Sequence, residues 1–190
     1  MAYNIYLVGM MGTGKTTIGK KLAEHLNRQF IDIDQYIVEE HGRSISDIFA
    51  TNGEAYFRDL ETDALRTISD KGETNPAVVA TGGGAFEREL NRKILMDSGK
   101  IVWLTTSIEE IVKRLNNDTT RPLLQTSEKK GKSQDSHNNE LEQRITTLMA
   151  SREHNYRLAD IHVTTDNKSP EDIVEEITAK LPIKYNNLNG

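Results

Sequence analysis

The 190-residue sequence contains no cysteine and no long apolar run. The absence of cysteine excludes disulfide bonds and thiolate chemistry. No segment is apolar enough over a sufficient length to cross a bilayer, and residues 1–4 lead into a strand pattern without the basic segment and long apolar stretch of a secretion signal. We therefore expect a cytoplasmic protein that does not contact membranes.

The sequence also lacks an excess of positive charge, because its formal net charge is −5. This balance gives no reason to expect nucleic acid or an acidic membrane as a partner, so any cations that bind an anionic substrate must be local. The length suits one domain with a sizeable core, and we expect residues 1–190 to form a single domain.

Apolar runs alternate with helical patterns along the chain, which is typical of a three-layer α/β fold with a five-stranded parallel sheet flanked by helices. The predicted strands are Ile5–Val8, Phe30–Asp32, Val78–Thr81, Ile101–Leu104 and Ile161–Thr164. The predicted helices are Thr17–Leu26, Gln35–His41, Ser46–Thr51, Glu54–Asp70, one that a capping box of Ser107 and Glu110 opens, and one that Ser169-Pro170 opens. Ligands of such sheets bind beyond the carboxyl ends of the strands, so residues at the strand ends are candidates for a site.

The segment from Gly9 to Thr16 fits the phosphate-binding loop G-x-x-x-x-G-K-[ST], between a predicted strand and a predicted helix. Glycines let consecutive backbone N–H groups surround a polyphosphate, Lys15 would reach the β- and γ-phosphates, and the Thr16 hydroxyl would ligate Mg²⁺. A glycine-rich turn followed by a chance Lys-Thr is the alternative, but all eight positions and both flanks match. We expect a nucleotide to contact Gly12, Thr13, Gly14, Lys15, Thr16 and Thr17.

Two carboxylates follow the second predicted strand in Asp32-Ile33-Asp34. If the strand continues there, both side chains face the phosphate loop, and a Mg²⁺ ion near Asp32 would relieve their repulsion. Asp34 would then face a phosphoryl acceptor. The alternative is that Asp34 only caps the next helix. The residues alone leave both interpretations open.

The chain resembles the shikimate kinases, small phosphate-loop enzymes of aromatic amino-acid biosynthesis, over nearly its whole length. The residues that carry the resemblance are Gly9 to Thr16, Asp32-Ile33-Asp34, Phe57-Arg58-Asp59-Leu60-Glu61, Thr81-Gly82-Gly83-Gly84, Arg121-Pro122-Leu123-Leu124 and Arg152 followed by Tyr156. The resemblance implies a P-loop NTP hydrolase-like fold with a mobile lid. It also implies transfer of the ATP γ-phosphoryl group to the 3-hydroxyl of shikimate, with one Mg²⁺ ion, in the chorismate pathway.

The resemblance further assigns the acceptor site to a helical region at about residues 34–62 and to later positions. Arg58 and Arg152 would hold the shikimate carboxylate, Glu61 would steady Arg58, Gly83 and Gly84 would meet the ring, and Phe49 and Phe57 would wall it. The residues by themselves allow plainer interpretations. Arg58 and Glu61 could be an exposed helix pair, Arg152 could lie on a solvated helix face, and both phenylalanines could be ordinary core.

For the chemistry, the resemblance implies that Asp34 orients the 3-hydroxyl and accepts its proton. Lys15 and Arg121 would stabilise the transferring group, and Asp32 with Thr16 would hold the metal. Arg114 would stack on adenine, or else be a helix-surface charge. The predicted lid covers about residues 117–139, and its polar part from Thr126 to Asn139 is expected to be disordered or mobile. The tail from Tyr185 to Gly190 is expected to fray.

Two other functions stay open. A kinase for another small hydroxy acid, such as gluconate, would keep Lys15 and Thr16 but would not need arginines at positions 58 and 152. A GTP-dependent switch protein would carry Asn-Lys-x-Asp, whereas here Asn167-Lys168 precedes Ser169-Pro170. We expect a monomer with ATP and shikimate as its ligands.

Overall fold

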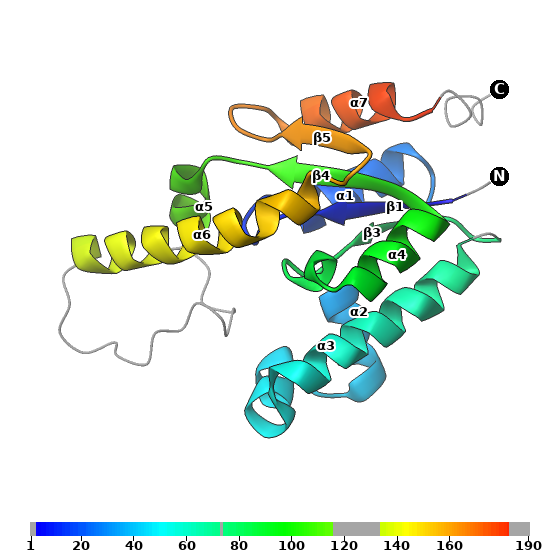
Figure 1. The fold of residues 1–190 in the computed structure, drawn as a ribbon. Helices are drawn as coiled ribbons and strands as arrows, with labels where there is room; N and C mark the ends of the chain where they lie inside the picture. Colours follow the sequence, from blue (N-terminus) through cyan, green and yellow to red (C-terminus); the bar gives the residue numbers. More distant parts are fainter. Residues whose placement is uncertain (1–2, 73, 116–133, 183–190) are drawn as a thin grey trace.

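The computed structural model describes residues 3–72, 74–115 and 134–182, apart from the side chains of residues 134–137. Five strands form one sheet in the order β2-β3-β1-β4-β5, and every neighbouring pair is parallel (Figure 1). The strands are β1 (Asn4–Val8), β2 (Gln29–Asp32), β3 (Ala77–Ala80), β4 (Gly99–Thr105) and β5 (Ile161–Thr164). The predicted five-stranded parallel sheet is therefore confirmed.

Helices cover both faces of this sheet. They are α1 (Lys15–His25), α2 (Ile33–His41), α3 (Ile45–Lys71), α4 (Glu89–Ser98), α5 (Ile108–Leu115), α6 (Gln134–Tyr156) and α7 (Pro170–Lys180), with a short 3₁₀ helix η1 at Ala85–Glu87. The sequence patterns do not predict α4, α6 or η1. Helices α1 and α7 pack together on one face, and α2, α3 and α4 lie on the other, where α6 runs past the end of the sheet (Figure 1).

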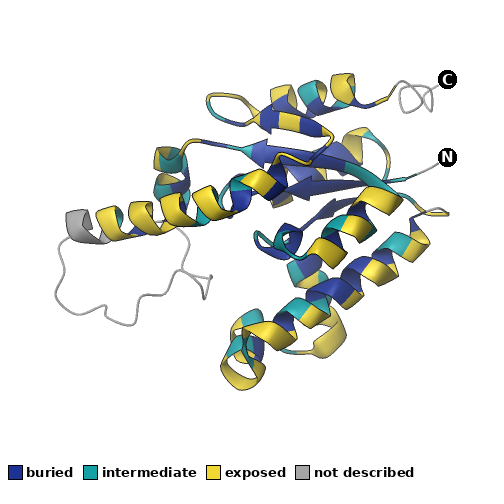
Figure 2. Cartoon of the chain, in the orientation of Figure 1, coloured by how far each residue is buried: buried dark blue, intermediate teal, exposed yellow. Residues whose placement is uncertain are grey.

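The side chains of β1 alternate between two separate cores. Ile5 and Leu7 pack with α1 and α7, whereas Tyr6 and Val8 pack toward α3, α4 and α6. Because both faces of the sheet are covered, β1, β3 and much of β4 are buried throughout (Figure 2). Such continuous burial explains why these strands read as apolar runs in the sequence rather than as alternating patterns.

Helix α3 is two helical segments that meet at Gly53. This residue has a φ of +81°, in the left-handed region that favours glycine, and its backbone is not helical. The kink confirms the predicted division between Ser46–Thr51 and Glu54–Asp70.

The carboxylates of Asp32 and Asp34 do not lie two apart on an extended strand, so this part of the prediction is wrong. Strand β2 ends at Asp32, whose Oδ1 accepts hydrogen bonds from the backbone N–H groups of Asp34 (3.1 Å) and Gln35 (3.4 Å). Asp32 is the N-cap of α2, and Asp34 lies in the first helical turn. Capping by a short carboxylate ends the strand here, because it satisfies N–H groups that have no partner within the helix.

The N-terminal caps predicted for α5 and α7 form to different degrees. At α7, Ser169 is the N-cap and Pro170 takes the first helical position, as the pattern predicts, and Ser169 and Asp172 also form a reciprocal capping box. At α5, Ser107 accepts from the Glu110 N–H at 3.4 Å, but the Glu110 carboxylate pairs with an arginine instead of returning to Ser107. The Ser107 N–H donates to Asp166, so only half of this predicted box forms.

Arg121, residues 117–133 of the predicted lid and the tail from Tyr185 to Gly190 lie outside the described residues. The last six residues of the predicted polar stretch, 134–139, belong to α6. For these residues the expectation of disorder is wrong, because they are helical, whereas the expectation that they are mobile stays a prediction. Farther along α6, Leu141 and Ile145 are buried, so packing stabilises the helix despite its polar beginning.

Candidate active site

The loop between β1 and α1 begins with a close contact between two backbones. At Gly9, which has a φ of +139°, an added Cβ would lie 2.3 Å from the Leu104 carbonyl oxygen. Only glycine lets the chain pass β4 this closely. Gly14, with a φ of +89°, then directs the chain into α1 at Lys15.

Polar side chains of the loop are held by nearby oxygens. Lys15 is 8% exposed, and its ammonium group donates to the carbonyl oxygens of Gly9 and Met10, each at 2.9 Å. The Thr16 hydroxyl donates to Asp32 Oδ2 at 2.8 Å, which joins the start of α1 to the end of β2. Lys15 therefore lies across the loop, and the Thr16 and Asp32 oxygens lie together beside it.

A cavity of about 200 Å³ opens over this loop. Its lining includes Gly12, Gly14, Lys15, Thr16, Thr17, Asp32, Asp34, Thr81, Gly82, Gly83, Arg114 and Leu115. The predicted loop residue Thr13 is fully buried, and its hydroxyl donates to the Met10 carbonyl oxygen at 2.8 Å, so its side chain supports the loop from beneath. Arg114 of α5 donates to the Gly12 carbonyl oxygen at 2.9 Å and pairs with Glu110 at 2.8 Å. The guanidinium group is thus fixed at the rim of the cavity.

The Thr16 and Asp32 oxygens have the chemistry that Mg²⁺ prefers. Mg²⁺ binds oxygen ligands and usually keeps several water molecules, with one or two protein carboxylates and the phosphates of a substrate. No group of three or more His, Cys, Asp or Glu side chains suited to a metal occurs in residues 3–72, 74–115 and 138–182. A set of one hydroxyl and one carboxylate suits a metal that arrives with a nucleotide better than a metal held by the protein alone.

A second cavity adjoins the first and is lined by Met11, Asp34, Ile45, Phe49, Phe57, Arg58, Glu61, Gly82, Gly83, Gly84 and Arg152. Asp34, Gly82 and Gly83 line both cavities. The fold thus brings α2, both segments of α3, the turn after β3 and the end of α6 to one place.

The two arginines of this cavity are not surface charges. Arg58 pairs with Glu61 at 2.5 Å, and the Glu61 side chain is fully buried, so an exposed helix pair is excluded. Arg152 is 9% exposed and donates to the Gly83 carbonyl oxygen at 3.0 Å, so a solvated helix face is excluded too. Two cations that face one cavity, Arg58 largely enclosed and Arg152 buried, favour an anionic ligand.

Glu61 has an unusual environment for a carboxylate. Burial raises its pKa to about 7, while Arg58 opposes this rise and the negative charge of Asp34 adds to it. A Cβ added at Gly82 would lie 2.3 Å from Glu61 Oε1 and 3.2 Å from Asp34 Oδ1. The two carboxylates therefore converge over Gly82, where a side chain would not fit.

Phe49 and Phe57 pack against each other with ring centroids 4.9 Å apart. Both line the second cavity, and Phe57 also belongs to the larger hydrophobic core, against which the partly buried Phe49 packs. The two interpretations from the sequence, pocket wall and ordinary core, are therefore compatible. The Arg58 guanidinium carbon lies 5.4 Å from the Phe57 ring centroid.

Tyr156 has a structural part that the sequence does not assign. Its hydroxyl donates to the Gly83 carbonyl oxygen at 2.6 Å, and its ring stacks on Phe86 and Trp103. Burial raises the pKa of this hydroxyl, so it remains protonated and a donor. The spacing of Arg152 and Tyr156, four residues apart, is the signal that could indicate a shared helix face.

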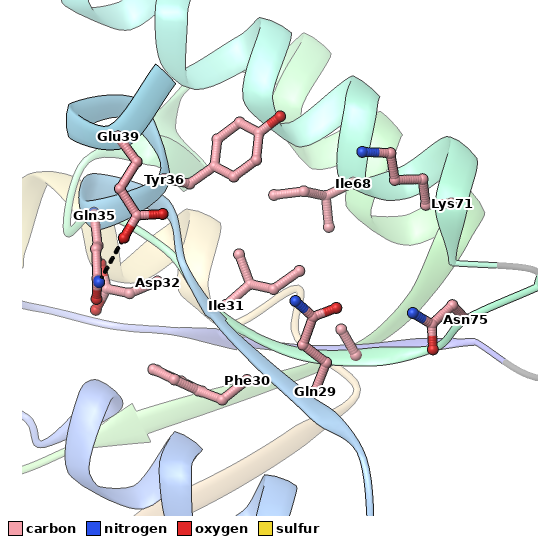
Figure 3. Close-up of a pocket in the computed structure, with 11 residues that line it drawn as sticks. Gln29, Phe30, Ile31, Asp32, Gln35, Tyr36, Glu39, Ile68, Lys71 and Asn75 are labelled. Atoms are coloured by element: carbon pink, nitrogen blue, oxygen red, sulfur yellow. Dashed lines mark hydrogen bonds between the residues drawn. The ribbon is translucent and has the colours of Figure 1, made fainter. Parts of the chain in front are cut away.

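A larger cavity, of about 310 Å³, lies at the edge strand β2 between α2 and the end of α3 (Figure 3). Tyr36, Ile31 and Ile68 form apolar walls, and Lys71 and Asn75 lie at one end. It shares Asp32 with the loop cavity but contains neither the glycine loop nor the paired arginines. Size therefore does not identify the chemical site here.

Within the described part of the chain, no helix has the length and apolar character needed to cross a membrane.

Comparison with known proteins gives a consistent result. The family model described as shikimate kinase matches residues 11–182. The chain is 42% identical over 178 residues to the shikimate kinase of Sulfurihydrogenibium sp. (strain YO3AOP1), covering 94% of this chain and 97% of that protein. It is 44% identical over 174 residues to the shikimate kinase of Geobacter sulfurreducens, covering 92% and 88%.

Solved structures resemble the fold to different degrees. The structure of shikimate kinase from Acinetobacter baumannii in complex with shikimate has a TM-score of 0.82 at 36% identity, covering 94% of this chain and 92% of that chain. A gluconokinase from Sinorhizobium meliloti covers 94% and 91% but has a TM-score of 0.54 at 17% identity. The second likeness extends to the fold alone.

Proposed function

The chain belongs to the shikimate kinase family, and from its site we propose how it transfers the ATP γ-phosphoryl group to the 3-hydroxyl of shikimate. It is an ATP-dependent kinase with an alcohol group as acceptor, and it acts in aromatic amino-acid biosynthesis. Its products are shikimate 3-phosphate and ADP. The observation that carries the assignment is that Arg58, whose side chain is 14% exposed, and the buried Arg152 line one cavity that adjoins the phosphate loop.

On the donor side, ATP lies over the glycine loop. Backbone N–H groups of Gly12 to Thr17 bind its phosphates, and the start of α1 adds its positive dipole end. Lys15 turns from the loop carbonyls to the β- and γ-phosphates, and Arg114 holds the adenine from the rim of the cavity. The hydrogen bonds that these cations make in the loop support this arrangement, because they keep both side chains at the cavity.

Thr16 and Asp32 would hold one Mg²⁺ ion, Thr16 directly and Asp32 directly or through water. When bound, this ion would neutralise charge on the phosphate oxygens. The 2.8 Å hydrogen bond between the two side chains keeps both oxygens at the same side of the loop. Replacing Asp32 with asparagine should preserve the α2 cap yet raise the Mg²⁺ concentration that turnover requires.

On the acceptor side, the shikimate carboxylate lies between Arg58 and Arg152. Arginine forks suit such a group, since each offers parallel N–H donors to a planar anion. The ring passes close to the backbone at Gly83 and Gly84, with Phe49 and Phe57 as the apolar wall. We assign this role to the helical region at about residues 34–62, together with the end of α6.

Asp34 lies where the two cavities meet, which suits a residue that handles the reacting hydroxyl. It orients the 3-hydroxyl toward the γ-phosphorus and accepts its proton, so that the hydroxyl oxygen is in line for attack. Lys15 stabilises the charge that develops on the transferring group. By resemblance, Arg121 adds a second cation from the lid, where in related systems such an arginine contributes about 10³ to 10⁵ in rate.

The test is ADP release by the purified protein with Mg·ATP and either shikimate, gluconate or no acceptor. We expect strong turnover with shikimate alone. Replacing Arg58 with alanine should abolish acceptor-dependent turnover, whereas Arg66→Ala, on the same helix but half exposed, should leave it unchanged. Faster turnover on gluconate than on shikimate would overturn the acceptor assignment.

We also propose that the protein is a cytoplasmic monomer that binds no nucleic acid. The net charge of −5 supports the part of this proposal that concerns nucleic acid, because a nucleic-acid partner calls for positive charge. Light scattering of the purified protein, with and without ligands, tests the monomer. A dimer mass at working concentration would contradict it.

A further inference from the structure

Arg58 is surrounded by carboxylates before any ligand arrives. Its Nη1 donates to Glu61 Oε2 at 2.5 Å, and its Nη2 and Nε donate to Glu54 Oε1 at 2.9 and 3.2 Å. The two glutamates differ in exposure, since the Glu54 side chain is 58% exposed and the Glu61 side chain is fully buried. A ligand carboxylate that reaches Arg58 becomes the third anion on one guanidinium group.

The other oxygen of Glu61 faces a fourth anion. Glu61 Oε1 is buried and has no hydrogen-bond partner in residues 3–72, 74–115 and 138–182. It and Asp34 Oδ1 lie 2.3 and 3.2 Å from the same point over Gly82, so they are at most 5.5 Å apart (2.3 + 3.2). Glu61 therefore stands between the arginine that binds the ligand and the carboxylate that handles the hydroxyl.

Three arginines stand near three carboxylates of the protein here, so a bound anion leaves this part of the site with an excess of negative charge. Besides Arg58, the charged groups that face Glu61 are Asp34 from α2 and Arg88, which precedes α4. Arg152 from α6 lines the same cavity, and the phosphate loop and the turn after β3 contribute only the uncharged Met11 and glycines there. For a buried carboxylate beside other anions, taking up a proton costs less free energy than staying ionised.

We propose that Glu61 takes up a proton from solvent when the carboxylate of the acceptor binds to Arg58 and Arg152. This inference rests on the proposed acceptor site. The proton removes the like charge next to the incoming anion, while the neutral carboxyl group can still accept a hydrogen bond from Arg58 through one oxygen. Glu61 is then a positioning residue that adjusts its charge to the ligand.

The direction of the pH dependence follows from linkage. Burial already brings the pKa of Glu61 to about 7, and a bound anion raises it further. The ligand therefore binds more tightly at low pH, where Glu61 is protonated in advance. If the bound anion raises this pKa by about one unit, affinity falls by roughly an order of magnitude between about pH 6 and about pH 9.

The experiment is titration calorimetry of shikimate into the intact protein at about pH 7.5, in two buffers with different ionisation enthalpies. The difference between the two measured enthalpies gives the number of protons taken up. We expect uptake of a fraction of a proton by the unmodified protein and none by Glu61→Gln. The matched control is Glu54→Gln, which removes the exposed carboxylate from Arg58 and should retain the uptake.

A second ligand tests whether proton uptake depends on the charge of the acceptor or on its shape. The methyl ester of shikimate keeps the ring and hydroxyls but carries no carboxylate, so it should bind without proton uptake. Equal uptake with the ester, uptake that persists in Glu61→Gln, or shikimate binding without any uptake would each overturn this inference alone. If shikimate did not bind at all, the proposed acceptor would fail and this inference with it.

Discussion

The hydroxyl of Tyr156 and the carbonyl oxygen of Gly83 form a hydrogen bond of 2.6 Å. The same carbonyl oxygen accepts from Arg152, which lies one helical turn earlier in α6. Two donors from one helix thus fix the backbone turn that lines both cavities of the site. The end of α6 contributes to the acceptor site by position as well as by charge.

Replacing Tyr156 with phenylalanine should weaken this arrangement without changing the stacked ring. We expect the free energy of unfolding to fall by about 1 kcal/mol and the KM for shikimate to rise about fivefold, because the Gly83 carbonyl keeps one donor of two. Urea denaturation and steady-state kinetics measure both effects. Tyr56→Phe, at a position that is 42% exposed, is the control. An unchanged KM in the Tyr156 variant would show that Arg152 alone holds the turn.

Replacing Asp34 with asparagine should lower kcat by about 10² to 10⁴, because the amide cannot accept the hydroxyl proton. ATP affinity should change little, since Asp34 lies at the boundary with the acceptor cavity rather than on the loop. Binding of ATP and turnover are measured on the same preparation. Asp63→Asn, on an exposed face of α3, provides the comparison. Near-normal turnover in the Asp34 variant would remove this residue from the mechanism.

Arg114 and its neighbour Lys113 offer a matched pair on α5. Arg114 is held by Glu110 and the Gly12 carbonyl oxygen, whereas the Lys113 side chain is 78% exposed. We expect Arg114→Ala to weaken ATP binding by about tenfold, equivalent to about 1.4 kcal/mol, with shikimate affinity unchanged. Lys113→Ala should bind ATP normally. Equal effects of both substitutions on ATP binding would indicate a general electrostatic effect rather than a contact of Arg114.

Stability should depend on pH through Glu61. Its pKa is near 7 in the folded protein, against an ordinary 4.5, so the folded state binds more protons than the unfolded state between these values. The free energy of unfolding therefore falls as pH rises from about 4.5 to about 7, with an upper limit of roughly 3 kcal/mol from this group. Urea denaturation at several pH values measures the fall.

The Glu61→Gln variant isolates this contribution. Because glutamine does not titrate, the stability of the variant relative to the unmodified protein should increase between about pH 5 and about pH 8. Two curves that stay parallel over this range would contradict the assignment of the pKa to Glu61.

The sequence predicts the sheet well because β1, β3 and β4 are buried on both faces and need apolar side chains throughout. Helices α4 and α6 escape prediction because polar residues occupy their inward positions. In α4, Asn91 is fully buried and accepts a hydrogen bond from Thr62 while donating to the Ala85 carbonyl oxygen. In α6, the inward face includes Arg152 and Asn155, a charged and a polar residue where periodicity requires apolar ones.

One part of the site could be predicted from neighbouring residues in the sequence, and the other part depends on residues that lie far apart in it. Eight consecutive residues suffice for the phosphate loop, because its geometry is set by its own glycines and the helix that follows. The acceptor cavity joins Asp34, Arg58 and Arg152, which come from three different helices. Spacing along the sequence does not show that residues of separate helices meet in space, so only the resemblance to a family predicts this cavity. The end of β2 shows the limit of local rules, since Asp32 caps α2 where an extended strand was expected.

The place of β1 in the sheet has a consequence for folding during synthesis. This first strand is the central one, and its two edges are filled by Val78–Ala80 of β3 and Gly99–Trp103 of β4. The strand that bears the phosphate loop therefore has no permanent neighbour until β3 has left the ribosome, and its second edge stays open until β4 has followed. Pairing of parallel strands that lie far apart in the sequence is slow, because the entropy cost of closing the long loop is met before any stabilising contact forms. The nascent chain therefore exposes this strand, which is fully buried in the folded protein, for longer than its neighbours β3 and β4, so the segment can aggregate during synthesis.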